Sequence, residues 1–514
     1  MIPNLILAAA NISKITVIFC AISTSFVVAA CGGGSPLPGP QPILNRAPLV
    51  ASANPDQSGQ VGYDYSYDVT QSGSTFSDPD GDILTFVTTF GSDVGLSESN
   101  GMISGIPTDK SDVTVTVTAT DPDGTSVSDS FNIGITIDQD SVQLAFGSNL
   151  DLDELENYAN QPVPDYIGAP RDNGNPVTDT GATLGRVLFY DVSLSIDDTV
   201  SCSSCHQQTR AFSDDRIVSQ GVFGGVTVRH SMRLINGRFG NGPLGADVGE
   251  NVIRMFWDER ASSAEDQASQ PIRDHDEHGF SGINGRPDFD DLIAKLEGIP
   301  YYEELFRLAF LSPEITEEKI QFALAQFVKS IQSFDSKYDA GRAQVDNEID
   351  DFPNFTADEN AGKRLFVTPF AEGGFNCFFC HTPPEFKISG PDFGRGHNGV
   401  AGVANDPSSF DFTNIRAPVL RDIVSPNSQL NGPLMHNASM TSLRQVIDHY
   451  NLVPVPPGEP ERTIFLATID ELLAPRGAPQ DFELTETEKN QVEAFLRTLT
   501  GSAVYTDLRW SSPF

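Results

Sequence analysis

The chain has 514 residues, and 70 Asp and Glu against 32 Lys and Arg give it a formal net charge of −38. With 39% hydrophobic and 20% charged residues, the composition is globular rather than disordered, and the length predicts two or three domains with buried cores. This acidic excess argues against nucleic acid or an anionic membrane surface as a partner, because both need a patch of Lys and Arg.

The first thirty residues differ in kind from the rest of the chain. Lys14 is their only charge, and an apolar run from Ile15 to Ala30 ends in Val28-Ala-Ala-Cys31. Because this run is shorter than the ~20 residues a helix needs to cross a bilayer, it predicts a cleaved export signal over residues 1–30. The ending resembles a bacterial lipobox, which implies lipidation of Cys31 and anchoring to the bacterial membrane, the outer one by preference. An ordinary cleaved signal is the alternative.

Residues 31–47 are rich in Gly, Pro and Ser and predict an extended linker. Over residues 48–140 the pattern changes to alternating strands, as in 113–119 and 131–137, separated by turn signals such as Asp80-Gly81. This pattern predicts an all-β sandwich.

Three phrases of this region, at residues 76–82, 103–107 and 119–124, resemble cadherin-like Ig-type modules of bacterial surface proteins. The clustered aspartates of such modules bind calcium, but Asp-Pro-Asp-Gly is also ordinary turn chemistry. Since the region has no Cys, His or Trp, we expect a spacer or a binding module.

Beyond Cys20 in the signal and Cys31 directly after it, four cysteines remain, and they fall into two short motifs, Cys202-Ser-Ser-Cys205-His206 and Cys377-Phe-Phe-Cys380-His381. This is the attachment pattern of c-type haem. Two cysteines three positions apart lie one helical turn from each other, so both can bind one porphyrin while the following His ligates the iron. Two disulfides, a zinc site or a dithiol redox pair are the alternatives.

From about residue 150 the pattern becomes helical with long loops. The mostly apolar positions 320, 322, 323, 326, 327 and 331 approximate one face of a helix over 317–331. We therefore expect two mainly α, cytochrome c-type haem domains, at residues 150–345 and 346–508, one for each motif.

Four segments of this region, at residues 184–191, 199–206, 256–261 and 362–366, resemble the bacterial dihaem cytochrome c peroxidases and their methylamine-utilisation (MauG-type) relatives. The resemblance covers about residues 150–505 in order. It implies that hydrogen peroxide is reduced at the haem of the first motif and that electrons enter through the second. It also implies that His206 is the proximal ligand of the peroxidatic haem and His381 that of the other.

The resemblance extends to Trp257, Gln267, Pro271 and Glu277, which match the family's distal-pocket spacing. It implies that Glu277 is the acid/base that moves a proton from the inner to the outer peroxide oxygen. By the same resemblance, Gln267 shapes the pocket and Trp257 relays electrons between the haems. The alternative is that Glu277 is one of many surface acids and Trp257 a core residue.

The chain departs from the family's peroxidases in one loop. They carry a removable distal His that caps the resting haem, whereas this sequence has Thr227 at the corresponding position. An uncapped haem would be open without reductive activation. His230, three residues later, leaves a capped form possible.

The sixth ligand of the second haem is Met in the peroxidases and Tyr in MauG-type enzymes. Residues 443, 446, 447 and 450 share one face of a helix predicted at 442–450, so Tyr450 points inward. Tyr450 also lies at the family spacing from Pro433. A core Tyr with Met435, Met440 or His436 as the ligand is the alternative. A phenolate ligand would favour ferric iron.

The family's calcium ion between the haems maps to Asn236, Asn431 and Pro433, the last two through carbonyl oxygens. Asn431 replaces the usual Thr, which a backbone ligand would tolerate.

Three functions follow from these residues. The first is a peroxidase fed by a small c-type cytochrome or cupredoxin. The second, favoured by Tyr450 and Thr227, is an enzyme that uses peroxide to oxidise Trp or Tyr of a partner protein. The third is a non-enzymatic electron-transfer or surface-binding haem protein, against which Trp257, Gln267 and Glu277 argue.

Overall fold

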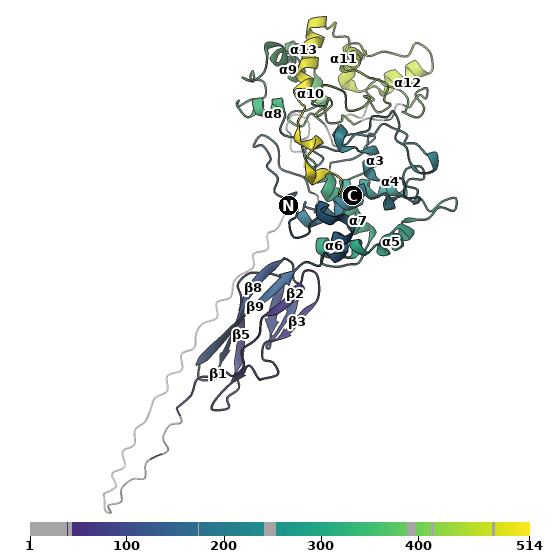
Figure 1. The fold of residues 1–514 in the computed structure, drawn as a ribbon. Helices are drawn as coiled ribbons and strands as arrows, with labels where there is room; N and C mark the ends of the chain where they lie inside the picture. Colours follow the sequence, from purple (N-terminus) through teal and green to yellow (C-terminus); the bar gives the residue numbers. More distant parts are fainter. Residues whose placement is uncertain are drawn as a thin grey trace, which may run out of the picture.

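The structure is a computed structural model that describes residues 39, 44–172, 174–240, 253–387, 397–411, 413, 416–474 and 478–514. The predicted signal, Cys31 and most of the predicted linker lie outside these residues. A strand-rich domain comes first and a larger helical part follows, as the sequence predicts (Figure 1). Every helix in these described ranges is too short or too polar to span a bilayer.

The first domain is a β-sandwich. One sheet has four strands in the order β2-β9-β8-β5, a second has three in the order β3-β7-β6, and β1 pairs with β4. The strands are β1 (Leu49–Val50), β2 (Gln57–Gln60), β3 (Tyr65–Asp68), β4 (Phe76–Ser77), β5 (Thr85–Phe90), β6 (Leu96–Ser99), β7 (Met102–Gly105), β8 (Ser111–Thr120) and β9 (Ser126–Thr136).

The alternation in β8 explains how the sandwich buries its core. Val113, Val115 and Val117 are at most 1% exposed, while the threonines between them face outward. Side chains of successive strand residues point to opposite faces of a sheet. The valines of β8 therefore all face the core, and the threonines all lie on the opposite face. The strands predicted around 113–119 and 131–137 are confirmed as β8 and β9.

The acidic turns of the sandwich are contacted by the segment that precedes it. Arg46 forms an ion pair with Asp80 at 2.8 Å, and Asn45 Nδ2 donates to Asp121 Oδ2 at 2.8 Å. Two aspartates that the sequence offers as calcium ligands are therefore engaged by neighbouring side chains.

The sandwich rests against helix α6 (Pro300–Phe310) of the helical part (Figure 1). Tyr63 donates its hydroxyl hydrogen to Glu304 at 3.2 Å, and the Arg307 guanidinium lies 3.8 Å from the centre of the Tyr63 ring. Burial, followed by the charge of Glu304, raises the pKa of Tyr63 to about 12. The two parts are thus in direct contact through a cation–π and hydrogen-bonded pair.

The helical part has thirteen α-helices in the described residues. The first eight are α1 (Asp140–Phe146), α2 (Asp179–Tyr190), α3 (Cys202–Cys205), α4 (Ala264–Arg273), α5 (Phe289–Glu297), α6 (Pro300–Phe310), α7 (Glu317–Ser330) and α8 (Lys337–Arg342). The others are α9 (Ala357–Val367), α10 (Cys377–Cys380), α11 (Leu443–Asn451), α12 (Glu461–Thr468) and α13 (Glu486–Arg497). The helices predicted at 317–331 and 442–450 are confirmed as α7 and α11.

Two helix pairs repeat one design, α2 with α7 and α9 with α13. A methyl group at Gly185 of α2 would lie 1.9 Å from the Ala323 carbonyl oxygen of α7, and one at Gly362 of α9 would lie 1.8 Å from the Gln491 carbonyl oxygen of α13. Only glycine permits such close backbones. Each glycine is followed four residues later by a buried phenylalanine, Phe189 or Phe366.

The same four helices begin in the same way, with a threonine whose side chain accepts a hydrogen bond from the backbone N–H three residues later. These residues are Thr178, Thr316, Thr356 and Thr485. A side-chain oxygen at this position satisfies an N–H that the helix cannot pair. The two helix pairs therefore share both their close glycine-mediated packing and their threonine caps.

The end of the chain returns to the first helical pair. Tyr190 donates its hydroxyl hydrogen to the Trp510 carbonyl at 2.6 Å, and Arg186 Nε donates to the Ser511 carbonyl at 2.6 Å. Figure 1 shows the C-terminus beside α7 rather than beside α13. This tail ties the two helical halves together.

Candidate haem sites

The first Cys-x-x-Cys-His motif forms one helical turn, α3, and ends at His206. The His206 backbone N–H donates to the Cys202 carbonyl at 2.9 Å, which keeps both cysteines on one side of the turn. Neither Cys202 nor Cys205 is in a disulfide, and burial raises the pKa of each thiol to about 12.

The orientation of the His206 ring is fixed by a backbone carbonyl. Nδ1 lies 3.0 Å from the Phe212 carbonyl oxygen. Because a carbonyl can only accept, Nδ1 carries the hydrogen, and Nε2 keeps its lone pair for an iron ion. Burial lowers the pKa of His206, which also favours the neutral ring.

The second motif repeats this arrangement. Helix α10 carries Cys377 and Cys380, and His381 Nδ1 lies 3.2 Å from the Phe386 carbonyl oxygen and 3.1 Å from that of Pro418. Burial lowers the pKa of His381 to about 4, so its Nε2 also offers a lone pair.

The two carbonyls that hold the histidines share an unusual backbone. Phe212 has φ 60° and Phe386 has φ 54°, in the left-handed region that non-glycine residues rarely adopt, and both side chains are fully buried. Such strain persists at functional sites where the surroundings enforce it. Sequence reasoning missed these residues, because a phenylalanine carries no signal for a left-handed conformation.

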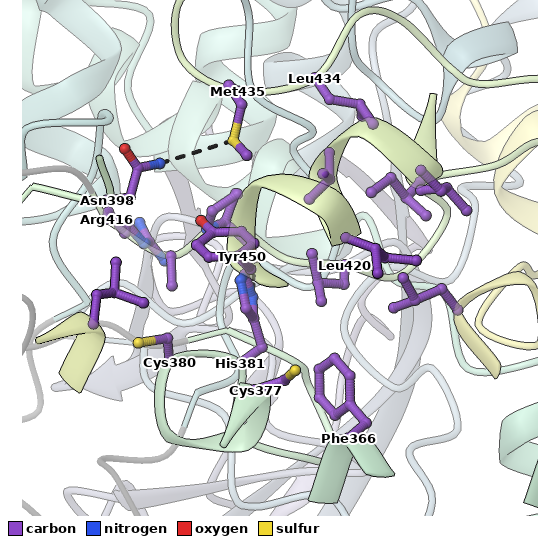
Figure 2. A pocket seen from close by; sticks show the side chains of 18 of the residues that line it. Phe366, Cys377, Cys380, His381, Asn398, Arg416, Leu420, Leu434, Met435 and Tyr450 are labelled. Atoms are coloured by element: carbon purple, nitrogen blue, oxygen red, sulfur yellow. Dashed lines mark hydrogen bonds between the residues drawn. The ribbon is translucent and has the colours of Figure 1, made fainter. Parts of the chain in front are cut away.

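A cavity lies over the second motif, and Figure 2 shows Cys377, Cys380, His381 and Tyr450 around it. Its lining includes Arg233 and Arg416, whose Nε atoms are buried without a hydrogen-bond partner among the described residues. Burial lowers the pKa of both guanidinium groups. Two thiols, one imidazole and two buried cations match the vinyl groups, iron and carboxylates of a haem, so the residues present fit this cofactor.

Gln267 and Pro271 lie on α4, and Glu277 lies in the loop that follows the helix. Gln267 and Pro271 lie one turn apart on the helix, and the Pro271 carbonyl accepts from the His278 backbone N–H at 3.3 Å. The neighbouring Glu277 backbone N–H donates to Asp274 Oδ1 at 3.0 Å. The end of α4 therefore fixes the loop that carries Glu277.

The half-buried Glu277 carboxyl interacts electrostatically with the first motif. Its charge acts on both the Cys202 and the Cys205 thiol. Burial, with a smaller contribution from Asp274, raises the pKa of Glu277 to about 7. A carboxyl with such a pKa can both accept and donate a proton near neutral pH.

Trp257 lies between the two halves. Its indole Nε1–H donates to the His230 carbonyl at 2.7 Å, its own carbonyl accepts from the Arg416 backbone N–H at 2.7 Å, and its ring lies 6.2 Å from that of His436. Trp257 also lines the cavity over the second motif.

The loop with Thr227 and His230 is held by its own hydrogen bonds. Thr227 Oγ1 accepts from the Ser219 backbone N–H at 2.9 Å, and His230 Nδ1 donates to the Arg216 carbonyl at 3.0 Å. His230 is 5% exposed, and burial lowers its pKa to about 4. The Thr227 side chain is thus part of a turn, and His230 is a buried neutral residue.

The candidates for the sixth ligand separate by position. Tyr450 and Met435 line the cavity, whereas Met440 packs against the apolar core and is not among its described lining residues. His436 is not among them either, and its Nε2 donates to the Gly402 carbonyl at 2.9 Å.

Two predicted calcium ligands lie in one buried polar cluster. Asn236 Oδ1 accepts from the Ser333 backbone N–H at 2.8 Å, and Asn431 Nδ2 donates to the Asp422 carbonyl at 2.7 Å. Asn431 Oδ1 and Asp422 Oδ2 are buried with no partner among the described residues. Pro433 lines the neighbouring cavity. Asp422 is a residue that sequence reasoning missed, and the described residues contain no cluster of three or more His, Cys, Asp or Glu suited to a metal ion.

Comparisons with known proteins agree with this arrangement. Residues 179–347 match the family described as di-haem cytochrome c peroxidase, and residues 47–136 match the one described as "Putative Ig domain". The methylamine utilization protein MauG of Methylophilus methylotrophus is 27% identical over 66% of this chain and 88% of its own length. Cytochrome c551 peroxidase of Nitrosomonas europaea is 25% identical over 67% of this chain and 85% of its own.

Among solved structures, a MauG-like protein associated with microbial copper homeostasis superposes with a TM-score of 0.53. It is 27% identical and covers 69% of this chain and 99% of its own. The family of the matched region implies two c-type haems, in agreement with the two motifs. Residues 179–347 therefore carry a di-haem cytochrome c peroxidase domain, and an Ig-type domain precedes them.

Proposed function

We propose that the protein is a dihaem peroxidase that reduces hydrogen peroxide to water at the His206 site, with electrons that enter through the His381 site from a small c-type cytochrome or cupredoxin. Each turnover consumes one peroxide, two protons and two electrons and forms two waters. When bound, the haem groups supply the redox chemistry of this reaction. The observation that carries the proposal is the half-buried Glu277 carboxyl, whose pKa is raised to about 7 and whose charge acts on the Cys202 and Cys205 thiols.

Glu277 is the proton carrier of this proposal. It accepts a proton from one peroxide oxygen and delivers it to the other, which then leaves as water. Gln267, one helical turn from Pro271, offers an amide that can hold peroxide in place. His206, whose Nδ1–H is held by the Phe212 carbonyl, keeps its ring orientation throughout.

The proposal assigns electron transfer between the sites to Trp257. Its ring lines the His381 cavity, and its indole N–H is held by the carbonyl of His230, which belongs to the first helical half. Tyr450 is the proposed sixth ligand of the second haem, because it lines that cavity and the alternatives Met440 and His436 do not.

Two features favour a second function, the oxidation of Trp or Tyr in a partner protein. They are Tyr450 on the second cavity and Thr227 at the position of the capping His. In this case the partner residue supplies the two electrons. The MauG relatives named above support this alternative by similarity.

Three further assignments complete the proposal. A calcium ion between the sites would be held by Asn236, Asn431 and Pro433, and the unpartnered oxygens of Asn431 and Asp422 favour a cation there. The protein would be exported and anchored by Cys31, facing the periplasm or the cell surface. The Ig-type domain would hold the enzyme away from that membrane or bind a surface ligand.

Steady-state kinetics of the haem-loaded protein test the peroxidase function. A reduced small c-type cytochrome should be oxidised in a peroxide-dependent reaction, and Glu277→Gln should slow it by about 10²- to 10⁴-fold, the usual contribution of a general acid/base. Asp276→Asn, which changes the exposed neighbouring acid, is the matched control. No peroxide-dependent oxidation by the loaded wild type would contradict the proposal.

A further inference from the structure

A short hairpin at residues 219–227 lies directly against the loop that carries Glu277. The Gly221 backbone N–H closes this hairpin by donating to the Gly225 carbonyl at 2.9 Å. The next residue, Val222, donates its backbone N–H to the Glu277 carbonyl at 3.0 Å. The backbone of Glu277 is therefore bonded to the hairpin.

Two glycines of the hairpin approach one peptide group of that loop. A methyl group at Gly225 would lie 2.5 Å from the Asp276 carbonyl oxygen, and one at Gly221 would overlap the same oxygen. Both glycines have negative φ, so close approach rather than an unusual backbone conformation requires them. The peptide group that joins Asp276 to Glu277 therefore fits against the hairpin only when both positions are glycine.

The base of the hairpin is fixed to the turn of the first motif. Ser219 Oγ donates to Asp214 Oδ2 at 2.6 Å. The other carboxylate oxygen, Oδ1, accepts from Gln207 Nε2 at 3.4 Å, and Gln207 directly follows His206. Because Asp214 is fully buried, it joins the two segments away from solvent. A continuous set of contacts thus runs from His206 through the hairpin to Glu277.

The loop is anchored on its other side by His278. The His278 ring donates from Nδ1 to the Leu194 carbonyl at 2.9 Å, and the His278 carbonyl accepts from the Ile196 backbone N–H at 3.0 Å. The loop therefore cannot retreat as a unit when the hairpin side is pushed. A displacement there must turn the backbone at Glu277.

We propose that Gly221 and Gly225 are positioning residues that set the Glu277 carboxyl relative to the His206 site. The hairpin contains no charged residue. The charges that act on Glu277 come from other segments, from Asp274, Asp276 and Arg260. A methyl group on either glycine would therefore move Glu277 without adding or removing a charge. This inference rests on the acid/base role of Glu277 in the proposed function.

The test is a double-mutant cycle on the haem-loaded protein, which measures the rate constant for the reaction with hydrogen peroxide. Gly221→Ala should slow this reaction by about 10²-fold, the usual cost of misplacing a catalytic group by about 1 Å, and should keep the resting ferric spectrum. Gly221→Ala/Glu277→Gln should be no slower than Glu277→Gln alone, because the glycine acts only through the carboxyl. If Gly221→Ala does not fold, Gly225→Ala should show the same pattern with a smaller loss. Gly458→Ala is the matched control and should react like wild type.

The pH dependence separates positioning from a loss of folded protein. The wild-type rate profile should have its midpoint at the pKa of Glu277, about 7. Gly221→Ala should shift this midpoint towards the ordinary range of a carboxyl, whereas a variant that is only destabilised keeps the wild-type midpoint. Thermal unfolding gives a readout without peroxide, because the pH dependence that Glu277 contributes between pH 5 and 7 should shrink in Gly221→Ala.

Glu277→Gln distinguishes this inference from the proposed function. If Glu277→Gln slows the reaction but both glycine variants react like wild type, the role of the hairpin is overturned and that of Glu277 stands. A double variant slower than Glu277→Gln alone would overturn it as well. If Glu277→Gln reacts at the wild-type rate, the acid/base role of Glu277 is wrong, and the positioning role fails with it.

Discussion

The indole N–H of Trp257 donates to the backbone carbonyl of His230 at 2.7 Å. His230 belongs to the loop that carries Thr227, and its own backbone N–H donates to the His436 carbonyl at 3.0 Å. A tryptophan between the two candidate haem sites is therefore bonded to the loop that caps the resting haem in related peroxidases.

This bond leads to a prediction for Trp257→Phe. The variant should keep both haems but slow electron sharing between them by about tenfold, equivalent to ~1.4 kcal/mol in activation free energy. Stopped-flow spectra of the half-reduced protein after addition of peroxide measure this rate. The other tryptophan gives the control, because Trp510→Phe lies in the C-terminal tail and should leave the rate unchanged. Equal rates in both variants would show that Trp257 does not carry electrons between the two haems.

The pKa of Glu277 predicts the pH dependence of the reaction with peroxide. Burial raises this pKa to about 7, so the carboxylate that accepts the peroxide proton forms mainly above neutral pH. The rate constant should rise up to about tenfold per pH unit below pH 7 and level off above it, and Glu277→Gln should abolish this dependence. A wild-type profile that is flat between pH 5 and 8 would argue against Glu277 as the base.

The same shift has a consequence for stability. Because the folded pKa of Glu277 lies above its unfolded value, its contribution is complete below the unfolded pKa and is lost as pH rises through about 7. Thermal unfolding of Glu277→Gln should therefore be less pH-dependent than that of wild type between pH 5 and 7. An identical pH dependence in both proteins would contradict the assigned shift.

The ion pair of Arg421 with Asp339, at 2.9 Å, is almost completely buried. Burial opposes ionisation of Asp339, but the Arg421 guanidinium outweighs it and holds the pKa of that carboxyl below its ordinary value. Arg421→Met leaves a buried carboxylate unpaired and should lower the free energy of unfolding by about 3–5 kcal/mol. Denaturant titration measures this, with the exposed pair Arg364–Asp351 as the reference, where Arg364→Met should cost at most ~1 kcal/mol.

The glycines at the helix crossings give a second stability prediction. Gly185→Ala and Gly362→Ala must each push two helices apart, and each should destabilise its pair by about 1–3 kcal/mol. Gly458→Ala, whose methyl group would have no neighbour closer than 4.0 Å, is the control. Thermal denaturation of the three variants measures this difference. Equal melting temperatures in all three would show that helix packing does not require glycine at positions 185 and 362.

The local patterns of the sequence predict much of this fold. The alternation in β8, the apolar face of α7 and the two Cys-x-x-Cys-His motifs each depend on residues close together in the chain, so the sequence alone reveals them. The roles predicted for Gln267, Pro271 and Glu277 stay predictions; the structure shows that the first two lie one turn apart on α4 and that Glu277 lies in the loop after it.

Contacts between distant loops are not visible in the sequence. The carbonyls of Phe212 and Phe386 accept hydrogen bonds from His206 and His381. Both phenylalanines have a left-handed backbone, which their residue type does not predict. The Asn398 carbonyl accepts from His449 of α11 only because Gly399 allows this loop to approach the helix. Asn431 Nδ2 donates to the Asp422 carbonyl, and the Asp422 backbone N–H donates to the carbonyl of Leu499, just after α13.

The most direct test of the account adds one equivalent of hydrogen peroxide to the resting, fully ferric protein without any reductant, followed by stopped-flow spectroscopy and EPR. We expect a mixed high-spin and low-spin resting signal, no Met–Fe charge-transfer band, and an immediate, long-lived spectral change. Two low-spin haems that react only after half-reduction would contradict Tyr450 ligation and the uncapped haem, and no reaction in either the ferric or the half-reduced state would contradict the peroxidase function itself.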